Sequence, residues 1–369
     1  MTSHETQPIL SIRGLSKRYG DFEALSGIDL DVARGEFVAL LGPSGCGKST
    51  TLMAVAGFVE PDAGSIVLAG NDITALAPDK RHMGMVFQDY ALFPHMSVLE
   101  NVAFPLRMRK VSRREREEKA LAALETVQLP RKSIYARPSE LSGGQRQRVA
   151  VARALVFDPV MLLMDEPLAA LDRRLRQHLQ YELRHLQARI DTTVIYVTHD
   201  QEEALVLADR IVVMRNGQFE QVGKPRDIYD SPANAFVAGF LGESNSAPAH
   251  VVQRDSGAVR AVINGTEDPI EVPGDFAPAE GLFVVRPERL RVHAAGENSG
   301  ASLRAQIIDI AFLGDRLRAE LQLSDELAWT ANIPIRDVMG TEHLLARGNE
   351  VRVSWAPADG RLLPDNRGT

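Results

Sequence analysis

Apolar residues in the first 240 positions fall into short continuous runs that are separated by turn residues. Five such runs predict buried strands at 10–13, 28–32, 37–41, 65–68 and 83–87. A glycine-rich stretch follows the run at 37–41, and apolar residues then continue at helical spacing over 50–59. A strand, a glycine loop and a helix in this order predict an α/β core.

Helical spacing dominates residues 89–157, and strand patterns return after them. Ser112 and Glu115 form an S-x-x-E pattern, which predicts a capping box at the start of a charged helix. Apolar runs at 160–164 and 194–198 predict two more buried strands, with a helix at 173–189 between them. Continuous apolar strands that alternate with helices predict a parallel sheet covered on both faces. Such sheets bind ligands at the carboxyl ends of their strands.

The pattern changes near residue 246, and beyond it apolar and polar positions alternate with a period of two. The clearest stretches of this alternation are 317–323 and 351–355. A period of two predicts a half-buried, mainly antiparallel β-domain. We therefore expect an α/β domain at 9–240, with a helical subdomain at about 89–157, and a β-rich domain at 246–369.

Composition narrows the classes of partner. Hydrophobic residues make up 44% of the chain and charged residues 25%, and the net charge is −7, which argues against nucleic acid as a partner. Cys46 is the single cysteine, so no intrachain disulfide can form. Residues 1–8 lack the apolar core of a signal peptide, and no run reaches the ~18 apolar residues of a membrane span. We expect another chain to make any membrane crossing.

The glycine-rich stretch matches the phosphate-binding P-loop pattern G-x-x-x-x-G-K-[ST]. Glycines let backbone N–H groups surround a phosphate, and the helix that follows adds partial positive charge. Lys48 would reach the β- and γ-phosphates of ATP, and Ser49 would bind Mg²⁺. A glycine turn between a strand and a helix is the structural alternative for this stretch. Cys46 is interpreted as loop filler rather than as a nucleophile. The expected ATP-binding residues here are Gly42, Pro43, Ser44, Gly45, Cys46, Gly47, Lys48, Ser49 and Thr50.

Two carboxylates follow the predicted strand at 160–164. Asp165 suits Mg²⁺, held through water, and Glu166 is placed to orient or deprotonate an attacking water. A helix N-cap beside a loop carboxylate is the structural alternative for this pair.

A second phosphate-binding helix terminus is predicted further along the chain. Ser142 and Gln145 form an S-x-x-Q capping box, so Ser142 is the expected N-cap of the following helix. A capped helix is the plain interpretation, and a helix N-terminus offered to a phosphate is the functional one. The motif comprises Leu141, Ser142, Gly143, Gly144 and Gln145.

Residues 10–245 resemble the nucleotide-binding subunit of an ABC transporter, because six motifs appear in that family's order. The resemblance implies a head-to-tail homodimer with two ATP molecules and Mg²⁺ at the interface. Each ATP would contact the P-loop of one chain and Ser142, Gly143 and Gly144 of the other. The motifs are Tyr19, the P-loop, Gln88, residues 141–145, residues 160–166 and His199.

The same resemblance implies roles for single residues. Tyr19 would stack on adenine, Gln88 would contact Mg²⁺ and the attacking water, and His199 would touch the γ-phosphate. Asp172 matches the loop that crosses the dimer interface, and Ala170 stands where the family often has serine. Tyr19 also fits an ordinary half-buried aromatic, and His199 a strand-end cap.

The residues after Gln88 would form part of a groove for a permease coupling helix. Packing inside the helical subdomain is the alternative for them. They are Tyr90, Leu92, Phe93 and Pro94.

The tail at 246–369 resembles the TOBE extension of importer subunits, an OB-like domain. Its motifs are softer and lie at 285–288, 312–315 and 353–355. The tail contains 13 Arg, no Lys and 18 Asp plus Glu, and this acidic balance disfavours a nucleic-acid groove. Dimer bracing or regulation by a small ligand fits the tail better.

The resemblance favours an importer over an exporter, and residues 198–204 and 240–245 are closest to the spermidine/putrescine type. Iron(III), sulfate, sugar and aminophosphonate importers are similar alternatives. The implied partners are two integral-membrane permease subunits and, indirectly, an extracytoplasmic binding protein. The implied location is the cytoplasmic face of the inner membrane.

Two other classes of P-loop protein fit less well. DNA-repair ATPases of the ABC type usually separate the P-loop from the second motif by a long coiled coil or use a cysteine pair, and this chain has neither pattern. A small-molecule kinase would not need residues 141–145.

Overall fold

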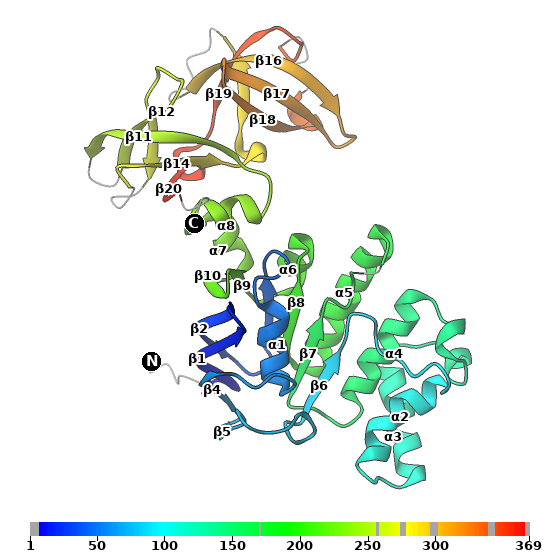
Figure 1. Cartoon of the computed structure of the whole chain (residues 1–369). Coiled ribbons are helices and arrows are strands. Elements are labelled where there is room, and N and C mark those ends of the chain that lie inside the picture. The colour runs from blue at the N-terminus through cyan, green and yellow to red at the C-terminus, as the bar shows by residue number, and fades with distance from the viewer. Residues whose placement is uncertain are drawn as a thin grey trace, which may run out of the picture. The chain divides into compact units, whose positions relative to one another are not determined.

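The computed structural model describes residues 7–169, 171–255, 258–273, 278–295, 302–338 and 344–365. The chain divides into two compact units, Met1–Arg226 and Asp227–Thr369, which Figure 1 colours from blue to green and from green to red.

A six-stranded sheet forms the centre of the first unit (Figure 1). Its order is β10-β9-β3-β8-β7-β6, parallel except for β10, which pairs antiparallel with β9 at the edge. β3 and β8 are buried at every position, which confirms the predicted parallel sheet with both faces covered. The bounds are β3 Phe37–Leu41, β6 Met83–Val86, β7 Met161–Asp165, β8 Thr193–Thr198, β9 Arg210–Arg215 and β10 Gln218–Gly223.

A second sheet of the first unit is antiparallel and has the order β2-β1-β4-β5. The strands predicted at 10–13, 28–32 and 65–68 belong to this sheet. β1 continues to Tyr19. The register of its pairing with β2 shifts after Ile12, but the pairing persists to Tyr19. One apolar core joins the two sheets through α1, Lys48–Ala56. The bounds are β1 Leu10–Tyr19, β2 Phe22–Val32, β4 Ala63–Leu68 and β5 Asn71–Asp72.

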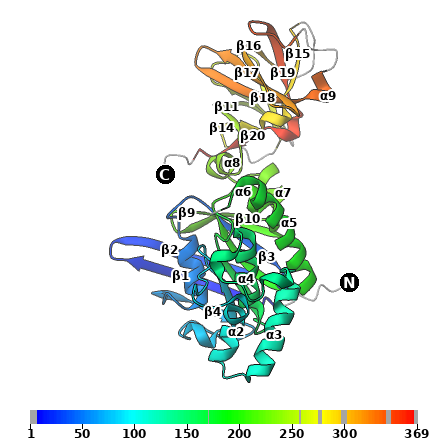
Figure 2. The same cartoon turned by 90° about the vertical axis from the view of Figure 1, so that its right-hand side faces the viewer.

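Three α-helices form the predicted helical part, which lies to the right of the sheets in Figure 1 and in front of them in Figure 2. They are α2 Val98–Met108, α3 Arg113–Thr126 and α4 Gly143–Leu155. The capping box predicted at Ser112 is only half formed. The Ser112 hydroxyl accepts a hydrogen bond from the Glu115 N–H at 3.4 Å. The Glu115 carboxylate instead pairs with Lys119 at 3.2 Å, because Lys119 lies one turn further along the helix.

Two further helices of the first unit are α5, Arg173–Ile190, and the shorter α6, Gln201–Leu207. α5 confirms the helix predicted at 173–189. Within the described ranges, no helix combines the length and the apolar character that crossing a membrane requires.

The second unit is built mainly from two five-stranded antiparallel sheets, which confirms the predicted antiparallel β-domain. Phe283, Trp329 and Trp355 pack against one another in its core, with ring centroids 5.3–5.8 Å apart. The first sheet contains β13 Ile270–Pro273, β12 Ala258–Ile263, β11 Asn245–Asp255, β14 Glu280–Val285 and β20 Arg361–Leu363. The second contains β15 Arg291–Ala294, β19 Glu350–Ser354, β16 Ser302–Phe312, β17 Arg316–Ser324 and β18 Leu327–Pro334, and the short helix α9, Ile335–Val338, follows β18.

The division between the units lies ahead of the boundary that the sequence predicts at 240–246. The segment after Arg226 carries α8, Ala235–Phe240, and most of α7, Pro225–Asp230. Ala235 and Ala238 of α8 form a buried cluster with Leu282, Val284 and Leu363. This packing assigns α8 to the β-rich unit, whereas the sequence pattern placed residues up to 240 in the α/β domain.

Candidate functional site

The predicted phosphate loop lies between β3 and α1, and its glycines either have a left-handed backbone or lie too close to other backbone atoms for a Cβ. Gly47 has φ 107° and caps α1. A Cβ on Gly47 would lie 2.5 Å from the carbonyl oxygen of Ala24, and one on Gly42 would overlap the carbonyl oxygen of Met214. The backbone therefore curls tightly enough to present the N–H groups of the α1 N-terminus, an arrangement that suits a phosphate.

Lys48 and Cys46 lie inside this loop. The Lys48 side chain is 5% exposed, and its Nζ donates to the carbonyl oxygens of Gly42 at 2.8 Å and Pro43 at 2.9 Å. Burial raises the pKa of the Cys46 thiol, which disfavours a reactive thiolate. This environment agrees with the interpretation of Cys46 as loop filler.

Ser49 and Asp165 meet across the first turn of α1 and the end of β7. The Ser49 hydroxyl donates to Asp165 Oδ1 at 3.1 Å. Burial is the main cause that raises the pKa of Asp165, and the charge of Glu166 raises it further, whereas Ser49 and Lys48 lower it. Hydroxyl and carboxylate oxygens are ligands that Mg²⁺ prefers, so this pair fits the predicted metal role.

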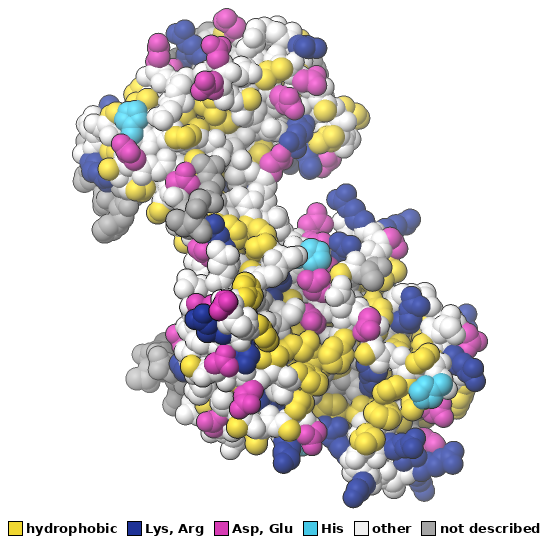
Figure 3. Space-filling model, in the orientation of Figure 1, with side chains coloured by type: hydrophobic (Ala, Val, Ile, Leu, Met, Phe, Trp, Pro, Cys, Tyr) yellow, Lys and Arg dark blue, Asp and Glu magenta, His cyan; other side chains and the backbone are white. Residues whose placement is uncertain are grey.

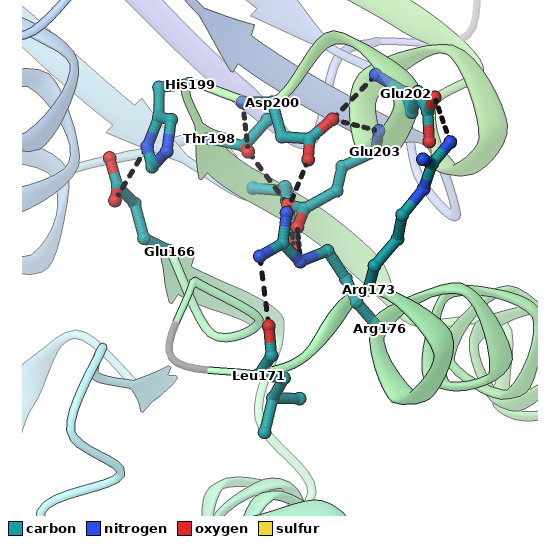
Figure 4. Close-up of polar contacts among 10 residues, drawn as sticks. Glu166, Leu171, Arg173, Arg176, Thr198, His199, Asp200, Glu202 and Glu203 are labelled. Carbon is teal, nitrogen blue, oxygen red and sulfur yellow. Dashed lines mark hydrogen bonds and ion pairs between the residues drawn. The ribbon is translucent and has the colours of Figure 1, made fainter.

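Glu166 and His199 form the second close pair. Oε2 of Glu166 lies 3.0 Å from Nδ1 of His199, and Figure 4 shows the two side chains pointing toward each other. Glu166 adopts φ 43°, a left-handed conformation, and its N–H donates to the Val197 carbonyl at 3.0 Å. The strand ends of β7 and β8 thus hold a carboxylate and an imidazole beside each other.

A polar network that the sequence analysis did not predict lies next to His199 (Figure 4). Arg176 donates to Asp200 Oδ2 at 2.8 Å and to the Leu171 carbonyl at 3.0 Å. Glu203 is 2% exposed and accepts from the hydroxyls of Tyr196 at 2.7 Å and Thr198 at 2.8 Å. The acidic cluster directly after the strand at 194–198 is the sequence feature that could have indicated this network.

The motif at 141–145 forms the predicted capping box. The Gln145 N–H donates to Ser142 Oγ at 3.3 Å, and the Ser142 N–H donates to Gln145 Oε1 at 2.9 Å. Leu141 and Gly144 are buried, whereas Ser142 is exposed at the start of α4. A Cβ on Gly143 would lie 2.7 Å from Leu171 Cδ2, so a glycine allows the closest approach of α4 to that leucine.

The other predicted site residues lie at element ends. Tyr19 ends β1 and is 49% exposed, with Lys17 Nζ 5.7 Å from its ring centroid. Gln88 is exposed just after β6, and Thr50 is half-buried in α1. Asp172 is the N-cap of α5, where its Oδ1 accepts from the Leu175 N–H at 3.0 Å. Ala170 lies outside the described residues.

The residues predicted to line a permease groove differ in exposure. Tyr90 is 6% exposed, and Arg153 donates to its carbonyl at 2.7 Å, so the Tyr90 side chain packs inside the helical part. Leu92 and Phe93 are half-buried and Pro94 is exposed. Only the last three therefore offer surface to a partner.

Comparison with known proteins matches both units. Residues 25–169 match the ABC transporter family and residues 283–363 match the TOBE domain. The "Spermidine/putrescine import ATP-binding protein PotA" of Aliivibrio fischeri is 42% identical over 98% of this chain and 98% of its own length. The protein of the same name from Photobacterium profundum is 47% identical over 98% and 97%.

A solved structure is similar to the first unit. It is the dimeric post-hydrolysis state of the ATP-binding cassette MJ0796 with ADP and Pi, at 32% identity and a TM-score of 0.52 over 59% of this chain and 99% of that one. These matches confirm the predicted P-loop ATPase core followed by a TOBE domain. The chain therefore belongs to the ABC transporter family, as one of its ATP-hydrolysing subunits.

Proposed function

We propose that this chain energises a binding-protein-dependent importer of spermidine and putrescine by binding and hydrolysing ATP. The relatives whose names carry that function share 42% and 47% identity with it over 98% of its length. The TOBE match at 283–363 supports import, because it falls on the tail that resembles the extension of importer subunits.

The observation that carries the ATPase part is the meeting of functional side chains at the ends of three adjacent parallel strands. β3 leads into Lys48 and Ser49, β7 into Asp165 and Glu166, and β8 into His199. The 3.1 Å contact of Ser49 with Asp165 and the 3.0 Å contact of Glu166 with His199 join these strand ends. Parallel α/β sheets place their ligand sites at this edge.

In this proposal, the loop at 42–50 binds the triphosphate through backbone N–H groups and Lys48. The ammonium of Lys48 now donates to carbonyls of the loop, and phosphate oxygens are stronger acceptors for the same cation. Ser49, Gln88 and Asp165 would hold Mg²⁺, which neutralises phosphate charge when bound.

Glu166 would act on the attacking water. Its carboxylate accepts the proton or orients the water toward the γ-phosphate, a role that typically contributes ~10²–10⁴-fold in rate. His199 contacts the same carboxylate and would orient it, while also donating to the γ-phosphate. The left-handed backbone at Glu166, with φ 43°, directs the side chain toward His199.

A second copy of the chain would complete each ATP site. Ser142 is exposed at the N-terminus of α4, where free backbone N–H groups can bind a phosphate. We propose that Ser142, Gly143 and Gly144 of one chain contact the ATP held by the loop of the other, and that Asp172 lies at that interface. The similar cassette with ADP and Pi is a dimer. Since hydrolysis removes the bridging γ-phosphate, ATP turnover would open and close the dimer.

We propose that this chain binds two permease subunits at the cytoplasmic face of the inner membrane. An extracytoplasmic binding protein would be an indirect partner, through the permease subunits. Apolar side chains gather on one face of the first unit in Figure 3. Exposed large apolar residues of this unit include Phe58 at 57% and Met108 at 64%. Apolar surface of this kind suits a docked partner. Nucleic acid is not among the proposed partners.

Uptake of labelled putrescine and spermidine tests the cargo. Cells would carry this chain or its Lys48→Ala variant, with excess iron(III), sulfate, sugar or aminophosphonate as competitors. We expect uptake that requires Lys48 and that these competitors leave unchanged. Unchanged uptake with Lys48→Ala, while the purified unmodified chain hydrolyses ATP, would reject polyamines and point to one of the other cargoes.

A further inference from the structure

Arg176 connects three segments that are separate in the sequence. It lies in the first turn of α5, and its two terminal guanidinium nitrogens reach the carbonyl of Leu171 at 3.0 Å and the carboxylate of Asp200 at 2.8 Å. Its Nε lies 3.9 Å from Glu203 Oε1. Figure 4 shows the guanidinium between these groups. A planar fork can hold two acceptors in fixed directions, which a single ammonium cannot do.

The acceptors of Arg176 lie next to the proposed catalytic and interface residues. Asp200 directly follows His199, and Leu171 directly precedes Asp172. Glu166, which opens the segment leading to Leu171, contacts His199 at 3.0 Å. The segments that begin at Glu166 and at His199 are therefore joined at two places, once by the reactive pair and once by Arg176.

The remaining contacts of this cluster make the second junction rigid. Oδ1 of Asp200 accepts the N–H of Glu202 at 2.8 Å, while its Oδ2 is left for Arg176. Oε2 of Glu203 accepts two hydroxyls from β8, and its other oxygen faces Arg176. Arg176 itself is 26% exposed in its side chain, so solvent screens this ion pair only partly.

We infer that Arg176 is a positioning residue for ATP hydrolysis, which fixes the segment of His199 against the segment of Asp172. The inference rests on the proposed function. Arg176 does not touch the reacting groups. It acts by keeping Glu166 and His199 at hydrogen-bond distance. It also holds Asp172 in place while these two residues are in contact. A misplacement of 1 Å at a reacting group can cost about a hundredfold in rate.

The test compares Arg176→Met with Arg173→Met in the purified full-length chain. Arg173 lies on the same turn of α5, but its side chain is 83% exposed and only approaches Glu202 at 3.9 Å, so it is a matched control. We expect Arg176→Met to lower kcat for ATP roughly ten- to hundredfold, with KM within about threefold and only a small drop in melting temperature, since Asp200 and Glu203 lose one cation. Arg173→Met should behave like the unmodified chain.

Two further variants keep the inference testable if Arg176→Met folds poorly. Arg176→Lys keeps the charge but cannot bridge both acceptors, so it should lose part of kcat. Asp200→Asn keeps the shape and the N-cap of α6 but removes the charge that Arg176 pairs with, and should also lower kcat. The double variant Arg176→Met/Asp200→Asn should lose no more of kcat than Arg176→Met alone, because both changes break the same contact.

A normal kcat in Arg176→Met would overturn the inference, and so would losses of kcat, ATP affinity and melting temperature in equal measure, since these indicate a general structural role. Normal kcat in both Arg176→Lys and Asp200→Asn would overturn it as well. An unmodified chain without ATPase activity would instead contradict the proposed function. Activity in the unmodified chain, undiminished in Arg176→Met, would overturn this inference alone.

Discussion

The carboxylate Oε2 of Glu166 lies 3.0 Å from Nδ1 of His199, although 33 positions separate the two residues in the sequence. The contact exists because β7 and β8 are parallel neighbours, so that the residues after them emerge at the same sheet edge. Glu166 also holds a left-handed backbone conformation, with φ 43°, which costs about 1–2 kcal/mol for a residue with a Cβ. The hydrogen bond from its N–H to Val197, at 3.0 Å, helps to offset that cost.

Replacing Glu166 by Gln should separate binding from hydrolysis. The amide keeps the size of the side chain but cannot accept a proton from water. We expect ATP binding to persist, hydrolysis to fall by ~10²–10⁴-fold, and an ATP-bound dimer to accumulate. Single-turnover hydrolysis and size-exclusion chromatography with ATP measure these effects.

Glu117→Gln is the matched control for this prediction. Glu117 pairs with Arg113 on the exposed surface of α3, at 2.9 Å, so its loss should leave ATP turnover unchanged. Normal hydrolysis in Glu166→Gln would exclude Glu166 as the residue that acts on the water.

Local patterns predicted the parts of the site that lie within one strand–loop–helix segment. The glycine loop before α1 and the capping box at Ser142 each occupy fewer than ten consecutive residues, so their geometry follows from the residues themselves. The strand that ends at Asp165 and the strand that precedes His199 were predictable because they are continuous apolar runs. The sequence also predicted that ligand-binding residues lie at the carboxyl ends of these strands. It did not predict that β7 and β8 are neighbours, so the Glu166–His199 contact is a finding of the structure.

Features that depend on packing between distant segments could not be predicted in this way. Arg176 faces Asp200 because α5 packs beside α6, and nothing in the spacing of either helix specifies the partner. α8 belongs to the β-rich unit because it packs on β14, whereas the sequence pattern placed residues up to 240 in the α/β domain. The sequence allowed Tyr90 either at a docking groove or packed inside the helical subdomain, because an exposed and a buried aromatic look alike in a sequence. Its exposure of 6% supports the second alternative.

Replacing Ser142 by Arg should block ATP-dependent dimerisation and spare ATP binding by the monomer. Ser142 is exposed at the N-terminus of α4, where a second chain would place its γ-phosphate. A long cation there obstructs the approach. The substitution also removes the capping hydrogen bond of Ser142, which costs about 0.5–2 kcal/mol of stability. Light scattering with ATP and a fluorescent nucleotide titration measure dimer and affinity.

Ser112→Arg controls for the lost cap. Ser112 is an exposed N-cap at the start of α3, and its hydroxyl accepts a backbone N–H at 3.4 Å. It should show a similar loss of stability but normal dimerisation. Weakened ATP binding by monomeric Ser142→Arg would argue against a site shared between two chains.

Replacing Asp165 by Asn should stabilise the nucleotide-free protein at neutral pH. Burial raises the pKa of Asp165 above its ordinary value of 3.8, so the folded state binds a proton more tightly than the unfolded state. The charged carboxylate therefore lowers the free energy of unfolding as pH rises from 3.8 through the raised pKa, and this loss is complete above it. Asn carries no charge and can still accept from Ser49.

The gain should be largest at pH 7.5 and should shrink as pH falls toward 3.8. Melting temperatures at several pH values test this, with the exposed Asp79→Asn as control. With Mg²⁺ and ATP present the order should reverse, because the variant loses a proposed metal ligand and thus ligand stabilisation. A lower melting temperature for nucleotide-free Asp165→Asn at pH 7.5 would show that burial is not the dominant effect on this carboxylate.

Alanine at two glycines of the phosphate loop should give unequal effects. At Gly45, φ is 80° and a Cβ would meet no atom within 4 Å, so the change costs the left-handed conformation alone, about 1–2 kcal/mol. At Gly47, φ is 107° and the Cβ would lie 2.5 Å from the Ala24 carbonyl oxygen. A backbone atom cannot rotate away, so the loop itself must shift. Gly47→Ala should therefore lose more stability in urea unfolding than Gly45→Ala, and its ATP affinity should fall at least tenfold. Equal losses in the two variants would mean that the loop relaxes freely, and its tight curl would then not be what positions the phosphate.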